Sequence, residues 1–414
     1  MPTAATQAVS SDTGSKSDPP AEPARWVSPA EEADYLRQRI AATPEDESLY
    51  FRLATVCFKM ANPWEAEYCY RHLTRINPKN LDAWRQFARL NGGEDTTATA
   101  ALRRRELFAR AIGLHDAGRF SEAHEAYLQT LAGSVNHSAA WNLQILELDQ
   151  SADPPDQPRI SIYVCCHKAG PAPQDEVHKP IHVGAALAAS RIGHPGDDSG
   201  PNISAKNRSY CELTGHYWAW QNDRDSDFIG LAHYRRLFWF SHIQDPSISR
   251  HNRKAIPLNG LFGSVMRPEI ARRMIASSDV IVPMRWRLGA LDQQFVTTAP
   301  NGHKADYALL WNLMVEIANR NHPDIYQGGK AVVAAGDGHC YNMMVMRRPY
   351  FEEYSAFLFD VMERLEQCAA QIGISIFASR VAGFIAERLM SIYIGYLRTR
   401  QQARIREVPI AHFI

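Results

Sequence analysis

The feature that most constrains the fold of this chain is a change in hydrophobic pattern at a proline-rich segment, Pro154–Pro158. Before it, from Pro29 to about Gln150, apolar residues recur at helical spacing. Directly after it, Ile160–Cys166 is a short β-branched and apolar run, which is typical of a strand buried on both faces. Because prolines disfavour a continued helix, the segment predicts a linker at 151–158 between two domains.

Length and composition agree with two domains and predict a tail. The chain has 414 residues, more than one hydrophobic core usually organises, and 45% of them are hydrophobic. Residues 1–28 are rich in Ala, Ser, Pro and Asp and cannot offset the entropy lost on ordering. The predicted organisation is a disordered tail at 1–28, a helical module at 29–150, the linker at 151–158 and an α/β domain at 159–414.

Two segments of the helical module resemble each other. At a constant offset of 57 residues, the matched positions are Ala66 and Ala123, Tyr70 and Tyr127, and Trp84 and Trp141. Pro44 and Pro78 each close a helix–helix unit and lie 34 residues apart, which is the tetratricopeptide period. Such a module either holds a protein partner in its groove or serves only as a packing cap, and both readings stay open.

Charge and cysteine content restrict the partners and the compartment. The 45 basic and 45 acidic residues give a formal net charge of zero, so no global field attracts nucleic acid and any anion binding must be local. The seven cysteines form no C-x-x-C pair or zinc-site spacing, which favours reduced thiols in a cytoplasm. Since the chain has no apolar run of about 18 residues and no signal-peptide core, we expect it to be neither secreted nor membrane-spanning.

Cationic side chains follow two predicted strands of the second domain. Ile160–Cys166 ends in His167-Lys168, and Phe228–Ala232 ends in His233-Tyr234-Arg235-Arg236. Ligands in open α/β sheets gather beyond the carboxyl ends of the strands, so these groups are predicted to face a crevice. Burying such cations is costly without an anion, and a diphosphate, which arginine grips through paired hydrogen bonds, supplies one. Structural salt bridges of the two arginines are the alternative.

A polar loop precedes the predicted helical segment Tyr210–Trp220. It contains Asp197 and Asp198, which can bind Mg²⁺ or Mn²⁺ together with substrate oxygens. It continues with Asn202, Ser204 and Asn207 near a helix N-terminus, where N–H groups favour an anion or sugar hydroxyls. The alternative is that these side chains only cap the helix.

Six ordered segments carry a family resemblance: ISIYVCCHK, GDDSGPNISAKN, YCELTGHYWAW, DFIGLAHYRR, NMMVMRRPYFEEY and GFIAERL. Together they resemble the bacterial capsular-polysaccharide and exopolysaccharide biosynthesis glycosyltransferases, a family long described only as a domain of unknown function. The resemblance spans about Arg159 to Tyr396. It implies a GT-A-like α/β fold, a Rossmann-type mixed sheet flanked by helices, behind an all-α tetratricopeptide-like repeat.

The resemblance also implies site residues. GT-A enzymes carry an Asp-x-Asp that holds a metal against the donor diphosphate, and His233-Tyr234-Arg235 stands in that place. It therefore implies that His233, Arg235 and Arg236 bind the diphosphate without a metal, and no cofactor is expected, although Mg²⁺ or Mn²⁺ stays open. The further nucleotide- or sugar-binding candidates are His167, Lys168, Asp197, Asp198, Asn202, Ser204, Asn207, Tyr234, His339 and Asn342.

Glu387 is the catalytic candidate that the resemblance suggests. It lies on a predicted helix that begins at Arg380 and continues through Tyr396. In inverting GT-A enzymes a carboxylate at a comparable place removes the proton of the acceptor hydroxyl. A pairing of Glu387 with an adjacent arginine is the structural alternative. The reserve carboxylates are Asp292, Asp306 and Asp337.

Three hypotheses of function follow. The first is an inverting, metal-independent hexosyltransferase that moves a sugar from a nucleotide donor, with UDP favoured and galactofuranose one candidate sugar, to a glycan or lipid-linked glycan in surface-polysaccharide synthesis. Because such acceptors can be lipid-linked, peripheral association of the protein with the inner membrane surface stays open. The second is a non-catalytic tetratricopeptide scaffold with a degenerate sugar-binding domain, since Asp-x-Asp is missing. Nucleotide-sugar hydrolysis or phosphotransfer ranks last, because no P-loop is present.

Overall fold

The computed structural model of the chain consists of two compact units, which divide between Leu114 and His115. It describes residues 28–60, 62–77, 80–90, 95–131, 137–154, 157–243, 255–256, 265–287, 289–300, 302–376, 380–401 and 403–413. The predicted tail, apart from Ser28, lies outside the described residues, as does the middle of the predicted linker.

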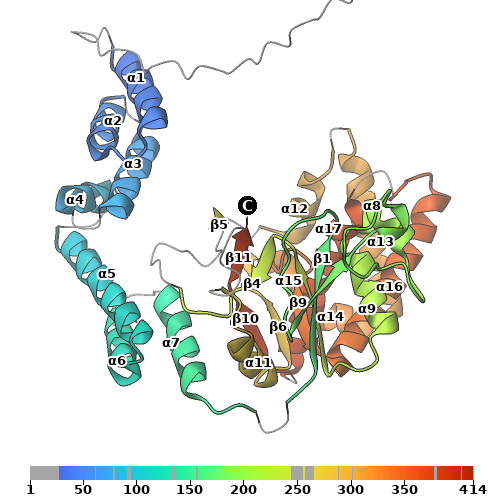
Figure 1. The fold of residues 1–414 in the computed structure, drawn as a ribbon. Helices are drawn as coiled ribbons and strands as arrows, with labels where there is room; N and C mark the ends of the chain where they lie inside the picture. Colours follow the sequence, from blue (N-terminus) through green and yellow to red (C-terminus); the bar gives the residue numbers. More distant parts are fainter. Residues whose placement is uncertain are drawn as a thin grey trace, which may run out of the picture. The chain divides into compact units, whose positions relative to one another are not determined.

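The first unit is built from consecutive helices (Figure 1). They are α1 (Pro29–Ala42), α2 (Glu47–Lys59), α3 (Pro63–Ile76), α4 (Leu81–Leu90) and most of α5 (Asp95–Asp116). Each of the first three packs against the next. Ser28 caps α1 by accepting a hydrogen bond from the Glu31 N–H at 3.2 Å. Ala54 and Ala66 are fully buried between the helices. A helical module is thus present, and its tetratricopeptide character stays a prediction.

The last two helices of the predicted module, α6 (Phe120–Leu131) and α7 (His137–Gln150), belong to the second unit. The Trp141 indole N–H donates to the Ser241 carbonyl at 2.9 Å, and the Asn142 amide donates to the Ile243 carbonyl at 2.8 Å. Trp141 and Ile145 are part of a hydrophobic cluster of this unit. The sequence predicted that the helical module ends at residue 150. The compact units divide earlier, because α7 buries its apolar face on the α/β fold.

A nine-stranded mixed sheet forms the centre of the second unit. Its strands are β1 (Ile160–Cys166), β2 (His178–His182), β3 (Phe228–His233), β4 (Arg236–Phe238), β5 (Ala255–Ile256), β6 (Val280–Pro283), β9 (Met344–Arg347), β10 (Ile405–Val408) and β11 (Ile410–Phe413). β1 runs parallel to both β2 and β3, whereas β3 pairs antiparallel with β9 and β4. β7 (Trp286–Arg287) and β8 (Asp337–Gly338) form a separate pair. The predicted α/β class and the two predicted strands are confirmed.

Helices cover both faces of the sheet (Figure 1). Tyr163 and Cys165 pack into one hydrophobic cluster, while Ile162 and Val164 pack into the other, as the period of two in a strand requires. The first cluster contains residues of α9 (Leu213–Asn222), α12 (Leu291–Thr297), α13 (Lys304–Asn321), α14 (Pro323–Gly329), α16 (Arg348–Gln371) and α17 (Val381–Arg400). The second contains α7 and α11 (Pro268–Ala276). Two short helices, α8 (Asn207–Tyr210) and α15 (Ala331–Ala335), complete the set of described α-helices.

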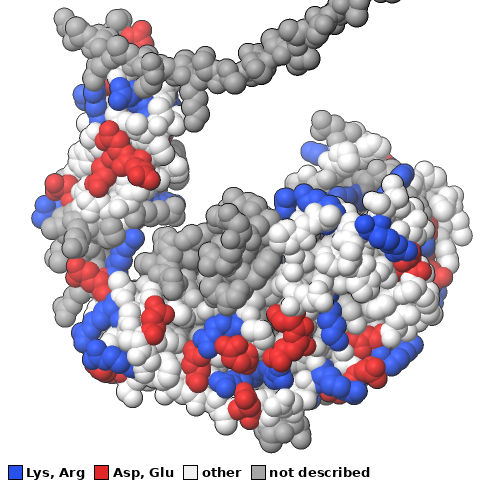
Figure 2. Space-filling model, in the orientation of Figure 1, with Lys and Arg blue, Asp and Glu red and all other residues white. Residues whose placement is uncertain are grey.

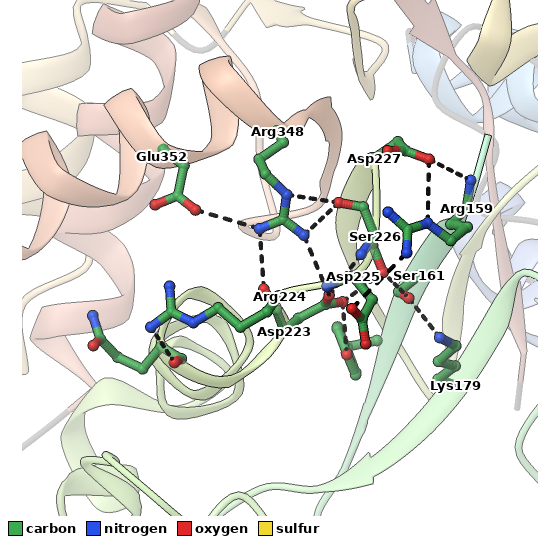
Figure 3. Close-up of polar contacts among 12 residues, drawn as sticks. Arg159, Ser161, Lys179, Asp223, Arg224, Asp225, Ser226, Asp227, Arg348 and Glu352 are labelled. Atoms are coloured by element: carbon green, nitrogen blue, oxygen red, sulfur yellow. Dashed lines mark hydrogen bonds and ion pairs between the residues drawn. The ribbon is translucent and has the colours of Figure 1, made fainter.

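A polar cluster lies at the amino ends of β1 and β3 (Figure 3). We call Ser161, Tyr163, Asp223, Ser226 and Arg348 the amino-end cluster. The hydroxyls of Tyr163 and Ser226 donate to Asp223 Oδ2 at 2.9 and 2.7 Å. Arg348 donates to the Ser226 carbonyl from Nε at 2.7 Å and to the Asp223 carbonyl from Nη1 at 3.0 Å. These bonds satisfy buried polar groups and join the sheet to the first turn of α16.

Candidate functional site

A cavity of about 430 Å³ opens at the opposite end of the same two strands. It is lined by Cys165, His167, Val183, Asn207, Arg208, Cys211, Glu212, His233, Tyr234, Arg235, Arg236, Arg380 and His412. Six of the residues predicted from the sequence are therefore brought together: His167, Asn207, His233, Tyr234, Arg235 and Arg236.

The parallel pairing of β1 and β3 explains this grouping. Cys165 pairs with His233 in the register of the two strands, so the residues that follow each strand meet at one edge of the sheet. The His167 and Tyr234 rings contact edge to face, with their centroids 5.1 Å apart. Lys168 is not among the lining residues, but its ammonium lies 5.8 Å from the centre of the Tyr234 ring.

Arginines give the cavity a positive lining. In the described part of the chain, neither Arg235 nor Arg236 forms an ion pair with a carboxylate, and the buried Nε of Arg235 has no hydrogen-bond partner. The Arg236 guanidinium lies 4.6 Å from the centre of the Tyr341 ring. Arg380 stands at the N-terminus of α17, where the helix dipole adds to the positive potential. The alternative of structural salt bridges for Arg235 and Arg236 has no support in these contacts.

This concentration of positive charge is local. The formal charges of the whole chain sum to zero, and basic and acidic side chains are interspersed on the face that Figure 2 shows. An anion that binds this protein through charge therefore has a specific place to do so, as the composition predicted.

His233 contributes differently from the cation that the resemblance implied. Its Nε2–H donates to the Tyr341 carbonyl at 2.6 Å. Burial lowers the pKa of His233, and the charges of Arg236 and Arg380 act in the same direction against the opposing effect of Glu212. Burial and the neighbouring Lys168 also lower the pKa of His167. Because an ordinary histidine already has a pKa near 6.5, both rings are neutral at pH 7, and the arginines supply the positive charge.

Two carboxylates stand near this lining. Glu212 is 9% exposed and lines the cavity, and its Oε1 accepts a hydrogen bond from the Asn342 side chain at 2.7 Å. Glu387 is not a lining residue. Its two oxygens accept hydrogen bonds from the Tyr341 N–H at 2.7 Å and from Arg388 at 2.9 Å. Burial raises the pKa of Glu387, and the charge of Arg388 opposes the rise.

A strained turn connects these groups. Tyr341 and Asn342 both have left-handed backbone conformations, with φ of 77° and 50°. Such conformations cost about 1–3 kcal/mol each in residues other than glycine and persist only where the surroundings impose them. Here the turn contacts His233 through a carbonyl, Glu387 through an N–H and Glu212 through a side chain. Asn342 thus does not line the cavity but holds the lining residue Glu212 in place.

The predicted polar loop is largely satisfied within itself. Asp197 is fully buried and accepts hydrogen bonds from Gly184 N at 2.9 Å, Ala185 N at 3.0 Å and the Ser204 hydroxyl. Asp198 pairs with Arg191 at 2.6 Å, and Asn202 bonds within the loop. None of Asp197, Asp198, Asn202 and Ser204 lines the described cavity. These four side chains are engaged within the loop and with its neighbours, and none of them caps α8 or α9.

His339 also lies away from the cavity lining. Its Nδ1 donates to the Pro283 carbonyl at 2.7 Å, and burial lowers its pKa to about 4. Its predicted role in binding a sugar has no contact in support. Asn207 does line the cavity, but its side-chain N–H groups donate to the Cys211 carbonyl at 2.7 Å and the Thr214 hydroxyl at 2.9 Å.

Several lining residues were missed by the sequence reasoning, above all Glu212, Arg208 and Arg380. The predicted helix Tyr210–Trp220 is interrupted at Cys211, whose φ is 50°, and α9 begins only at Leu213. A Cβ at Gly215 would meet a Val183 methyl at 2.9 Å, so glycine permits this end of α9 to approach the sheet. Of these three residues, only Arg208 could have been predicted from the sequence, because it directly follows the predicted site residue Asn207. No local signal places Arg380, which is far away in the sequence.

Metal and membrane features can be stated for the described residues only. Within the described ranges, no three His, Cys, Asp or Glu side chains cluster in a way that holds a metal ion. No described helix has both the length and the apolar character needed to cross a membrane. The independence of a metal stays a prediction.

The fold and the cavity define the class of this protein: an α/β protein whose mixed sheet carries an arginine-lined crevice beyond two parallel strands. More specifically, the chain belongs to the family described as Domain of unknown function (DUF4422), which matches residues 161–399. The resemblance identified from the six segments is confirmed to that extent.

The chain also resembles a glycosyltransferase fold. The chain is similar to the solved apo structure of WbbM, described as a bifunctional glycosyltransferase, with 30% sequence identity and a TM-score of 0.54. The match covers 61% of this chain and 45% of the WbbM chain. No curated protein matches the sequence.

Proposed function

We propose that the second unit is a glycosyltransferase that moves a sugar from a nucleotide-sugar donor, with UDP the expected nucleotide, to a glycan acceptor. The observation that carries this proposal is the pair Arg235 and Arg236, which line the cavity at the strand ends without a carboxylate partner among the described residues. A donor diphosphate is the anion that such a pair binds well. The likeness to WbbM supports the same class of reaction.

The chemistry requires charge stabilisation on one side of the scissile bond. When the bond between the anomeric carbon and the phosphate oxygen breaks, the nucleoside diphosphate leaves with the electron pair. Guanidinium groups that already face this position stabilise the charge without reorganising. We therefore propose that Arg235 and Arg236, aided by Arg380, take the part that a divalent metal plays where Asp-x-Asp is present.

The finer assignments rest on the family resemblance. They are an inverting reaction, a role in cell-surface polysaccharide synthesis, and a glycan or lipid-linked glycan acceptor. A UDP-linked galactofuranose is one candidate donor. The first unit is proposed to hold a protein partner or to act as a packing cap.

Calorimetry tests donor binding. The full chain is titrated with UDP-, GDP- and dTDP-sugars, including UDP-galactose and UDP-galactofuranose. We expect one nucleotide class to bind, and Arg236→Ala to weaken its binding by about 10- to 100-fold, because hydrogen bonds to charged groups contribute about 1.5–3 kcal/mol. Arg320→Ala is the matched control, since Arg320 is 74% exposed on α13 and pairs with Glu316 on the same helix.

Two results would decide against the proposal. Absence of binding to every nucleotide sugar favours the non-catalytic scaffold instead. Equal affinities of Arg236→Ala and Arg320→Ala place the donor elsewhere on the protein.

A further inference from the structure

The lining of the described cavity includes a single carboxylate, that of Glu212. No sequence motif assigned a role to it. Its Oε1 is held by the Asn342 amide at 2.7 Å, and the same amide nitrogen donates to the Gly383 carbonyl at 3.0 Å. Two acceptors thus fix the orientation of Asn342, which in turn fixes Glu212. In the described structure, the second oxygen of Glu212 has no ion-pair or hydrogen-bond partner, although arginines line the same cavity.

Glu387, the carboxylate suggested by the resemblance, is engaged differently. Both of its oxygens accept hydrogen bonds, one from the Tyr341 N–H and one from Arg388. The Arg388 side chain is only 4% exposed, so Glu387 neutralises a buried cation that would otherwise be unpaired. A carboxylate with this structural duty and no place on the lining is poorly situated to meet an acceptor hydroxyl.

We propose that Glu212 is the general base of the sugar transfer, and that Asn342 positions it. This inference rests on the proposed function and concerns the same cavity. The acceptor hydroxyl oxygen attacks the anomeric carbon and forms the new glycosidic bond. The proton of that hydroxyl passes to the Glu212 carboxylate. The bond to the phosphate oxygen breaks, and the nucleoside diphosphate leaves with the electron pair toward the arginines.

The cavity contains both a carboxylate to accept the proton and arginines to stabilise the leaving group. The base must take a proton while the leaving group gains negative charge, so the two events need groups of opposite charge within one site. Glu212 supplies the anion, and Arg235 and Arg236 supply the cations. The neutral His233 ring is held to the Tyr341 carbonyl and does not add a competing cation.

Replacement of Glu212 by glutamine is the direct test, because the variant keeps the shape of the side chain and removes its charge. Release of nucleoside diphosphate is measured with the panel of donors above and with methyl galactoside, methyl glucoside and water as acceptors. We expect Glu212→Gln to lower kcat by about 10²-fold or more. Donor affinity, measured by calorimetry, should stay within about threefold, which also shows that the variant is folded.

Three variants complete the comparison. Glu387→Gln should lower kcat by less than about tenfold, and Glu316→Gln, exposed on α13, should change nothing. Asn342→Ala should lower kcat while leaving the donor KM in place, since Asn342 orients the base and does not contact the donor.

Azide distinguishes a base from a structural residue. Azide attacks the anomeric carbon without losing a proton, so it needs no general base and yields a glycosyl azide. Added sodium azide should restore nucleotide release in Glu212→Gln and should not restore it in Arg236→Ala.

The outcomes separate the two proposals. A wild-type chain that releases no nucleotide from any donor overturns the proposed function and this inference with it. Near wild-type release by Glu212→Gln, or a loss that azide does not restore, overturns the assignment of Glu212 alone. A larger loss in Glu387→Gln than in Glu212→Gln moves the base to Glu387.

Discussion

The two ends of β1 and β3 treat buried polar groups in opposite ways. At the amino ends, Arg348 and Asp223 lie in a cluster where hydroxyls, carbonyls and charges satisfy one another (Figure 3). At the carboxyl ends, Arg235, Arg236 and Glu212 line one cavity without forming ion pairs among the described residues.

The contrast distinguishes stability from function within one sheet. Arg235 and Arg236 are half-buried, and unpaired charge that is partly withdrawn from water costs free energy, so a fold retains it where a ligand completes it. The amino-end cluster is complete without a ligand, and we assign it to stability. The arginines of the cavity have no such carboxylate partners among the described residues, and we propose that a bound anion supplies the missing charge.

The largest expected effect is the loss of stability when the amino-end cluster is disrupted. Asp223→Ala leaves the Tyr163 hydroxyl without its carboxylate and leaves Arg348 with Glu352 as its remaining ion-pair partner among the described residues. The Asp223 side chain is only 5% exposed. Breaking a buried ion pair costs about 3–5 kcal/mol. We expect a loss of that size in the free energy of unfolding, measured by urea denaturation. Asp225→Ala is the control, since that side chain is 92% exposed. Equal losses in the two variants would remove the distinction between the ends.

Arg236→Ala should behave in the opposite way. Among the described residues the side chain has no ion-pair partner to leave behind, and the ring contact that it gives up is the one with Tyr341. Such contacts contribute about 0.5–1 kcal/mol. The same denaturation experiment should therefore show a change of no more than about 1 kcal/mol, while donor binding weakens strongly. A loss of stability comparable to that of Asp223→Ala would make Arg236 a structural residue.

The Cys211 thiol reports on the charges of the cavity. Burial raises its pKa, the charge of Glu212 adds to the rise, and Arg380 opposes it with Nε 3.3 Å from Sγ. Since the thiolate is the reactive form, alkylation by iodoacetamide should be slow at pH 8 and accelerate only as the pH rises further. Glu212→Gln lowers the pKa and should speed the reaction by about threefold or more, whereas Arg380→Ala should slow it.

Peptide mass spectrometry identifies which cysteine has reacted, which matters because Cys340 and Cys368 are also partly exposed. Addition of UDP should protect Cys211 and leave Cys368 unaffected. Unchanged alkylation of Cys211 in both variants would show that Glu212 and Arg380 do not act on this thiol.

The smallest expected effect is that of metal removal. If arginines stabilise the leaving diphosphate, turnover in EDTA should equal turnover in Mg²⁺ or Mn²⁺. Loss of activity in EDTA with recovery on adding Mn²⁺ would show that the arginines alone do not stabilise the leaving diphosphate and that the protein uses a metal ion.

The sequence predicted the parts of the site that depend on local pattern. β1 has the predicted bounds, and β3 extends the predicted strand by His233, because buried apolar runs are readable without tertiary information. The grouping of His167 with Tyr234 followed from one rule about the carboxyl ends of parallel strands. Asp197 was predicted to bind the substrate or a metal, and in the structure it accepts hydrogen bonds from loop N–H groups. The sequence alone does not distinguish a carboxylate that holds a loop from one that binds a metal.

By itself the sequence determined that a helical module precedes an α/β domain and that arginines follow a central strand, because both are encoded in neighbouring residues. Only the tertiary structure decided that α7 belongs to the second unit and that Glu212 faces the cavity. Trp141 meets Ser241 across 100 positions, and Asn342 meets Glu212 across 130. Contacts at such separations depend on how the whole sheet assembles. In the turn that presents Asn342, the left-handed conformation of Tyr341 is one that its residue type does not predict.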